Sequence, residues 1–162
     1  MSGKMSALLA ILIFVADQWT KSLVVAGFPL GDSRPVIPGF FSLTHVRNRG
    51  GAFGLLADLP PVYGQLLFVL FAAVTVTLLA WMLRRTPRQD LGQRLALTFV
   101  IGGAIGNLYD RIRFGEVVDF LDVFVGTWHW PAFNVADSFI TMGVILLFWA
   151  ALRAEPERAP AA

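Results

Sequence analysis

Residues 62–83 read VYGQLLFVLFAAVTVTLLAWML, which is 22 positions without one charged side chain. The hydrocarbon core of a bilayer is about 30 Å thick, and a helix needs about 20 mostly apolar residues to cross it. This stretch therefore predicts a membrane-spanning helix, and it places the whole chain among integral membrane proteins.

Three further apolar segments extend the prediction to four transmembrane helices, at about 5–28, 62–83, 95–109 and 135–152. The first segment is apolar except for Asp17, Gln18 and Lys21 in its second half. Lys4 in front of it also suits a secretory signal peptide, but no small-residue cleavage site ends the segment and three more spans follow. We therefore expect one membrane domain of the all-α class over residues 1–162.

Composition supports a membrane protein and excludes other classes. Charged residues make up 15% of the 162 positions, against about 25% in ordinary soluble domains, and hydrophobic residues make up 56%. The net charge of +2 provides no basic patch, so we expect no nucleic-acid partner. The chain has no cysteine, which removes disulfides, thiolate metal sites and cysteine nucleophiles together.

Arginines in the connection at 84–94 predict the orientation of the chain. Four of them lie within these 11 residues, and short loops rich in Lys and Arg stay in the cytoplasm. Both termini would then be cytoplasmic, and the longer connections at 29–61 and 110–134 would face outward. In the first of these, residues 40–46 predict a short strand, and residues 50–59 predict a short helix that ends before Pro60.

Ionisable residues within apolar segments need a partner or a purpose, because each costs at least about 2.5–3.5 kcal/mol on membrane-insertion scales. Asp17 and Lys21 are four residues apart on one helix face, so they either neutralise each other or serve a site. Asn107 and Arg111 have the same spacing at the outer end of the third helix, where a solvated helix end is the alternative.

The polar residues share one level of the predicted bundle. Asp17, Asn107 and Arg111 lie toward outer helix ends, Asp137 opens the fourth helix, and Asp119 lies in the loop between the third and fourth helices. Asp137 also suits a plain capping role, because a helix N-terminus favours an acid. Five polar groups at one level indicate a shared site at the outer membrane face.

Paired carboxylates are the chemistry that these residue types allow. The chain has no HExxH motif, no serine in a GxSxG context and only the two histidines His45 and His129, so we expect no metal and no cofactor. Two neighbouring aspartates do not both ionise cheaply, so one can take a proton from water while the other donates one. The predicted pair is Asp119 and Asp137, with Asp110 and Asp122 as the alternatives.

Five motifs follow one another along the chain. They read DQWTK at 17–21, NRGGAFG at 48–54, GNLYDR at 106–111, VVDF at 117–120 and FNVAD at 133–137. In these motifs the chain resembles the lipoprotein signal peptidases, the bacterial signal peptidase II family. The resemblance implies an aspartyl protease of the bacterial inner membrane with Asp119 and Asp137 as its catalytic dyad. The supporting residues that it implies are Asp17, Lys21, Asn48, Gly50, Asn107, Arg111 and Asn134.

The same resemblance implies what the enzyme acts on. Its substrate would be a prolipoprotein, cleaved on the amino side of a diacylglyceryl-modified cysteine, and globomycin-like cyclic peptides would inhibit it. A small extracytoplasmic β-cradle would include residues 40–46, and a short periplasmic helix would cover residues 50–59. We expect a monomer in contact with membrane lipids.

Two other functions fit part of the pattern. A small transporter or channel would need charges throughout the bundle, whereas residues 62–83 have none. A scaffold protein would pack Gly102 and Gly106 against another membrane protein, but that function leaves the spacing of Asp119 and Asp137 unexplained.

Overall fold

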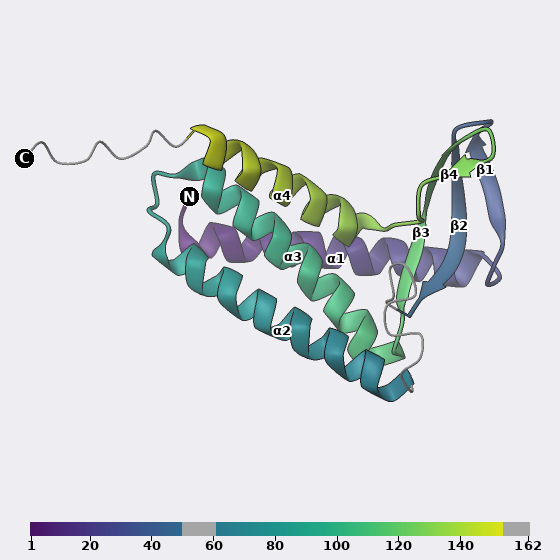
Figure 1. Ribbon diagram of the computed structural model, residues 1–162, viewed down its shortest axis with the longest axis horizontal. Coiled ribbons are helices and arrows are strands. Elements are labelled where there is room, and N and C mark those ends of the chain that lie inside the picture. Colours follow the sequence, from purple (N-terminus) through teal and green to yellow (C-terminus); the bar gives the residue numbers. More distant parts are fainter. Residues whose placement is uncertain (50–60, 154–162) are drawn as a thin grey trace, which may run out of the picture.

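In the described part of the chain, residues 1–49 and 61–153 of the computed structural model, four long helices form a bundle with a small sheet at one end (Figure 1). The helices are α1 (Gly3–Gly27), α2 (Pro61–Arg85), α3 (Leu91–Phe114) and α4 (Val135–Arg153). We call the end that carries the sheet the sheet end. The end with the connection between α2 and α3 is called the opposite end.

Three of the described helices are long and apolar enough to cross a membrane, over Gly3–Gly27, Val62–Arg85 and Val135–Leu152. They coincide with three of the four predicted spans. α2 exposes large apolar side chains such as Leu66, Phe71 and Trp81, as a helix in contact with lipid does. α3 has 24 residues but carries polar and charged groups toward both ends, so a fourth span stays a prediction.

α3 lies among the other three helices and packs against each of them. Glycines make this close packing possible, because small residues let helix backbones approach one another in a membrane. A Cβ atom on Gly102 would lie 3.0 Å from the Cβ atom of Ile13 on α1. A Cβ atom on Gly103 would collide with the backbone carbonyl of Ala136 on α4. The position of α3 therefore depends on the absence of side chains here.

The described strands form one antiparallel sheet in the order β1-β2-β3-β4. They are β1 (Ser33–Ile37), β2 (Phe41–Asn48), β3 (Val117–Val125) and β4 (Trp128–His129). β2 confirms the strand predicted at 40–46. The loop predicted between the third and fourth helices is wrong in part, because its valines and phenylalanines favour an extended chain that pairs with β2. The mostly helical bundle with one small antiparallel sheet agrees with the expected helical membrane domain and β-cradle. The short helix predicted at 50–59 lies outside the described residues.

Gly115 turns the chain from α3 into β3. Its φ of 76° lies in the left-handed region that favours glycine at the C-terminus of a helix, and its N–H donates to the carbonyl of Arg111 at 3.0 Å. Val118 and Phe120 of β3 then pack with Val24 of α1 in a small apolar core. This core packs the sheet against the end of α1.

We predict that Gly103→Ala destabilises the bundle and that Gly64→Ala does not. The methyl group added at Gly103 meets the backbone of Ala136, which moves only if α4 moves, whereas nothing lies within 4 Å of a Cβ atom at Gly64 on α2. Alanine is also the better helix former, by about 1 kcal/mol. The measurement is the thermal unfolding midpoint of both variants in one detergent. Equal midpoints would show that the packing does not require Gly103.

Candidate active site

The predicted site residues within the described part of the chain gather at the sheet end. They come from three helices, two strands and the residue that precedes α4. Gly50 lies outside the described residues. The others are Asp17 and Lys21 on α1, Asn48 on β2, Asn107 and Arg111 on α3, Asp119 on β3, Asn134 before α4 and Asp137 on α4.

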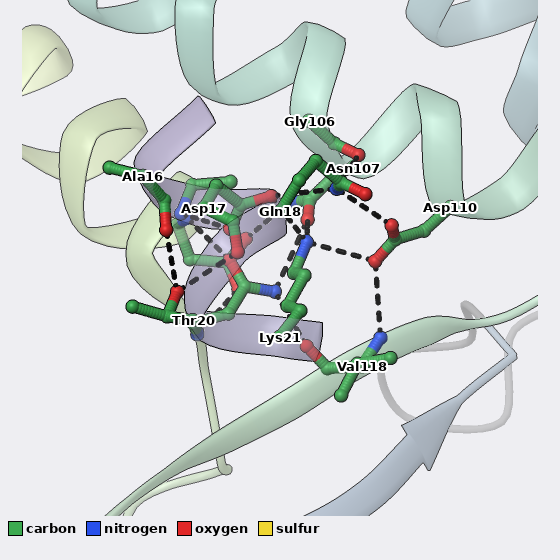
Figure 2. A network of polar contacts seen from close by, with 12 residues as sticks. Ala16, Asp17, Gln18, Thr20, Lys21, Gly106, Asn107, Asp110 and Val118 are labelled. Atoms are coloured by element: carbon green, nitrogen blue, oxygen red, sulfur yellow. Dashed lines mark hydrogen bonds and ion pairs between the residues drawn. The ribbon is translucent and has the colours of Figure 1, made fainter. Parts of the chain in front are cut away.

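Lys21 is the centre of a buried ionic cluster (Figure 2). Its Nζ atom lies 2.8 Å from Oδ2 of Asp17 and 2.9 Å from Oδ2 of Asp110, and it donates a hydrogen bond of 3.0 Å to Oδ1 of Asn107. The side chains of the three charged residues are at most 3% exposed. The pair of Asp17 and Lys21 predicted on α1 is therefore present, but it is not self-contained, because α3 supplies a second acid.

Gln18 and Asp110 complete this cluster, although neither is among the predicted supporting residues. Nε2 of Gln18 donates to Oδ1 of Asp110 at 2.8 Å and to Oδ2 of Asp17 at 3.1 Å. Oδ2 of Asp110 also accepts the backbone N–H of Val118 at 3.3 Å. The spacing of Asp110 from Asn107 is the signal in the sequence, because residues three apart share a helix face.

Asp17 joins α1 to both α3 and α4. Its Oδ1 atom accepts a hydrogen bond of 2.9 Å from the backbone N–H of Ala136, in the first turn of α4, where the helix dipole favours an anion. Gly106 lets this carboxylate reach α3, since a Cβ atom there would lie 2.6 Å from Oδ2 of Asp17. One carboxylate therefore holds the three helices that carry much of the site.

Asn134 and Asp137 cap α4 reciprocally. Oδ1 of Asn134 accepts the N–H of Asp137 at 2.9 Å, and Oδ2 of Asp137 accepts the N–H of Asn134 at 3.2 Å. This is the geometry of a capping box, with Asp in place of Glu. Asp137 therefore has the capping role that its position allows. Its Oδ1 atom accepts a further hydrogen bond of 2.7 Å from Nδ2 of Asn107.

Two side-chain amides bind the carboxyl group of Asp119. Nδ2 of Asn134 donates to Oδ1 at 2.7 Å, and Nδ2 of Asn48 donates to Oδ2 at 3.0 Å. Asn134 also donates to Oδ1 of Asn107 at 3.2 Å. Asn134 and Asn107 thus connect the two aspartates that the sequence pairs.

Burial raises the pKa of Asp119 to about 6. The carboxyl group is 2% exposed, and loss of water disfavours its charged form. The charge of Asp137 raises this pKa as well, whereas the hydrogen bonds from Asn48 and Asn134 lower it. Asp119 therefore holds a proton up to a higher pH than an ordinary aspartate does.

Arg111 lies beside the two aspartates, but no ion pair in residues 1–49 and 61–153 joins it to either. Its Nη1 atom donates to the carbonyl of Asn107 at 3.2 Å, and its guanidinium carbon lies 5.5 Å from the centre of the Phe68 ring. The charges of Asp137 and Asp119 act on this guanidinium. Nε of Arg111 is buried and has no hydrogen-bond partner among the described residues. The described residues therefore leave one buried donor of this side chain without a partner.

The remaining candidates have partners of their own elsewhere. Oδ1 of Asp122 lies 2.9 Å from Nδ1 of His129, and Nδ1 of His45 lies 2.8 Å from the carbonyl oxygen of Phe28. No three His, Cys, Asp or Glu side chains of the described ranges are grouped so that they could hold a metal ion. The arrangement therefore offers carboxylate, amide and guanidinium groups for chemistry.

A helical bundle with apolar helices long enough to cross a membrane and with buried, hydrogen-bonded polar groups gathered at one end is typical of a membrane protein with a functional site at that end. The chain belongs to the signal peptidase (SPase) II family, whose sequence model matches residues 9–153. This match confirms the resemblance found in the five sequence motifs.

Individual relatives and solved structures agree with this family. The lipoprotein signal peptidase of Syntrophotalea carbinolica is 52% identical over 90% of this chain and 89% of its own length. That of Geobacter sulfurreducens is 47% identical over 90% of each chain. A bacterial membrane enzyme solved by the in meso method at 2.3 Å resolution has a TM-score of 0.84 and 31% identity, over 99% of this chain and 96% of that one.

We predict that Lys21→Met destabilises the protein far more than Arg34→Met. The first change leaves Asp17 and Asp110 buried without their cation, and breaking a buried ion pair costs about 3–5 kcal/mol. Arg34 pairs with Asp32 at 3.2 Å, but its side chain is 59% exposed, and such pairs contribute about 0–1 kcal/mol. Unfolding midpoints in detergent measure both effects. Similar midpoints for the two variants would contradict a structural role for the cluster.

Proposed function

We propose that this chain removes the signal peptide of prolipoproteins by aspartic catalysis, with Asp119 and Asp137 as the catalytic pair. The observation that carries the proposal is the set of amides between the two carboxylates. Asn134 bonds to Asp119 and caps α4 together with Asp137, while Asn107 bonds to Asp137. The scissile bond would lie on the amino side of a diacylglyceryl-modified cysteine, as the family resemblance implies.

Asp137 suits the role of the ionised partner. It lies in the first turn of α4, where the helix dipole favours negative charge, and its oxygens accept hydrogen bonds from Asn107 and from the backbone of Asn134. Asp119 suits the role of the protonated partner, because burial raises its pKa to about 6. The two groups thus have different surroundings, which suits a pair in which one carboxyl group donates a proton and the other accepts one.

Hydrolysis by this pair requires one water molecule and no covalent intermediate. Asp137 takes a proton from the water as the water oxygen attacks the scissile carbonyl carbon, and Asp119 donates its proton to the carbonyl oxygen. The resulting diol then collapses and the C–N bond breaks. Asp137 passes its proton to the leaving nitrogen, and Asp119 recovers a proton from the diol, which restores the starting state.

The neighbouring residues position this pair and the substrate. Asn48, Asn107 and Asn134 orient the carboxyl groups through the hydrogen bonds described above. Arg111 would bind a substrate carbonyl or the ionised aspartate, because a guanidinium presents several donors in a fixed plane. Asp110 does not suit catalysis, since Lys21, Gln18 and a backbone N–H already bind its oxygens.

We place the sheet end at the outer face of the bacterial inner membrane, with both termini in the cytoplasm and α3 as the fourth span. The arginines at 84–94 support this orientation. An acylated cysteine keeps its chains in the bilayer, so a site at the membrane surface suits a bond next to that cysteine. Globomycin-like peptides would compete for the same site, and the chain would act as a monomer.

Asp119→Asn and Asp137→Asn should each lower cleavage by at least about a hundredfold, because an amide does not exchange the proton that acid–base catalysis needs. The measurement is cleavage of a diacylglyceryl-modified prolipoprotein by the purified protein in detergent, with the unfolding midpoint as the control for folding. Asp122→Asn is the matched change on the same strand as Asp119 and should cleave at the wild-type rate. Normal cleavage by either dyad variant would refute the assignment.

The rate of cleavage should depend on the protonation of Asp119. We expect kcat/KM to fall as the pH rises through about 6, because the proton on Asp119 is then lost. Asn48→Ala removes a hydrogen bond that lowers this pKa, so the fall should move to higher pH. The measurement is kcat/KM against pH for both proteins. If the decrease of kcat/KM occurs at the same pH in Asn48→Ala, or at a lower pH, a group other than Asp119 controls the alkaline side of the pH profile.

A further inference from the structure

A cavity of about 490 Å³ lies between α1, α2 and α3 at the opposite end of the bundle, away from the aspartate pair. This volume is within the range of about 300–1,000 Å³ that small-molecule sites occupy. Ala7 and Ala10 of α1 give the cavity a small apolar wall. Three arginines, Arg84, Arg88 and Arg94, contribute a basic wall. A cavity of this composition suits an amphipathic anion.

Arg94 is a buried cation in the lining of this cavity. Its residue is 5% exposed, and its Nη1 atom donates to the carbonyls of Thr86 at 2.6 Å and Leu83 at 3.0 Å, where α2 ends. Its Nε atom is buried and has no hydrogen-bond partner among the described residues. The positive charge of the side chain lies in the lining of the cavity, where it would attract an anion. The guanidinium thus points to an anionic ligand.

The charge around the cavity is positive and uncompensated in the described part of the chain. Arg84 and Arg88 are exposed, and no ion pair among residues 1–49 and 61–153 includes either of them or Arg94. The carboxylate of Asp90, in the same connection, accepts the N–H of Gln93 at 2.9 Å and caps α3. An anion would therefore meet three guanidinium groups here.

We propose that this cavity binds the phosphate of an anionic phospholipid through Arg84, Arg88 and Arg94. Guanidinium groups match the geometry of phosphate oxygens, and basic pockets between membrane helices bind anionic lipid headgroups. The lipid is a better fit than free phosphate because the alanine wall gives its acyl region an apolar surface. The proposed orientation makes the cytoplasmic leaflet its source, and lipid binding itself does not depend on the proposed cleavage.

Native mass spectrometry of the full chain in detergent tests the proposal with phosphatidylglycerol and phosphatidylcholine as probes. Phosphatidylglycerol should bind at least about fivefold more tightly. Arg84→Gln and Arg88→Gln should each weaken its binding about fivefold, the factor that corresponds to about 1 kcal/mol per basic residue. Arg85→Gln is the matched control, because Arg85 does not line the cavity and lies over the Trp81 ring at 5.3 Å. It should retain wild-type affinity.

Three results would overturn the proposal. Equal affinity for the two lipids would exclude recognition of the headgroup charge. An equal loss in Arg85→Gln and Arg84→Gln would show that diffuse surface charge attracts the lipid. The third test compares the unfolding midpoint of the protein with inorganic phosphate and with phosphatidylglycerol. If both raise the midpoint equally, the ligand is free phosphate. None of these readouts involves peptide cleavage, so they fail or succeed separately from the proposed function.

Discussion

The burial of Lys21 between two aspartates is the constraint on which the sheet end of the molecule depends. One ammonium serves two carboxylates, and the backbone N–H groups of Ala136 and Val118 supply the further donors that these carboxylates need. Such a cluster is stable only when every partner is in place, because each charge left unpaired in the interior is costly. It therefore fixes α1, α3 and the start of α4 together, and these elements carry Asn107 and Asp137.

Asp137 combines an observed structural role with the catalytic role that we propose for it. One of its oxygens caps α4 through the backbone of Asn134, and the other accepts a hydrogen bond from Asn107. Capping aligns the carboxylate with the start of the helix, where the dipole favours its charge. The same bonds that cap the start of α4 thus hold the proposed base in one orientation.

The sequence predicted the helices because crossing a membrane leaves few patterns to choose from, as the run at 62–83 illustrates. It also predicted that Asp17 and Asn107 would lie in one site, since both lie at one level of the bundle. β3 was not predicted although its valines and phenylalanines favour an extended chain, because its pairing partner, β2, lies far away in the chain and local sequence does not reveal the pairing. Asp110 was missed as a partner of Lys21 because spacing within one segment does not reveal contacts between segments.

The attachment of α2 follows from the lack of a hydrophobic driving force in lipid. Its membrane-crossing window contains half-buried but no fully buried residues, so α2 lies at the outside of the bundle. Polar side chains also connect α2 and α3 at both ends. Arg94 donates to the carbonyls of Leu83, in the last turn of α2, and Thr86, just after it, at the opposite end. Gln65 of α2 donates to the carbonyl of Arg111 at 2.9 Å at the sheet end. Because Arg111 faces the aspartate pair, the lipid-exposed helix takes part in placing the proposed site.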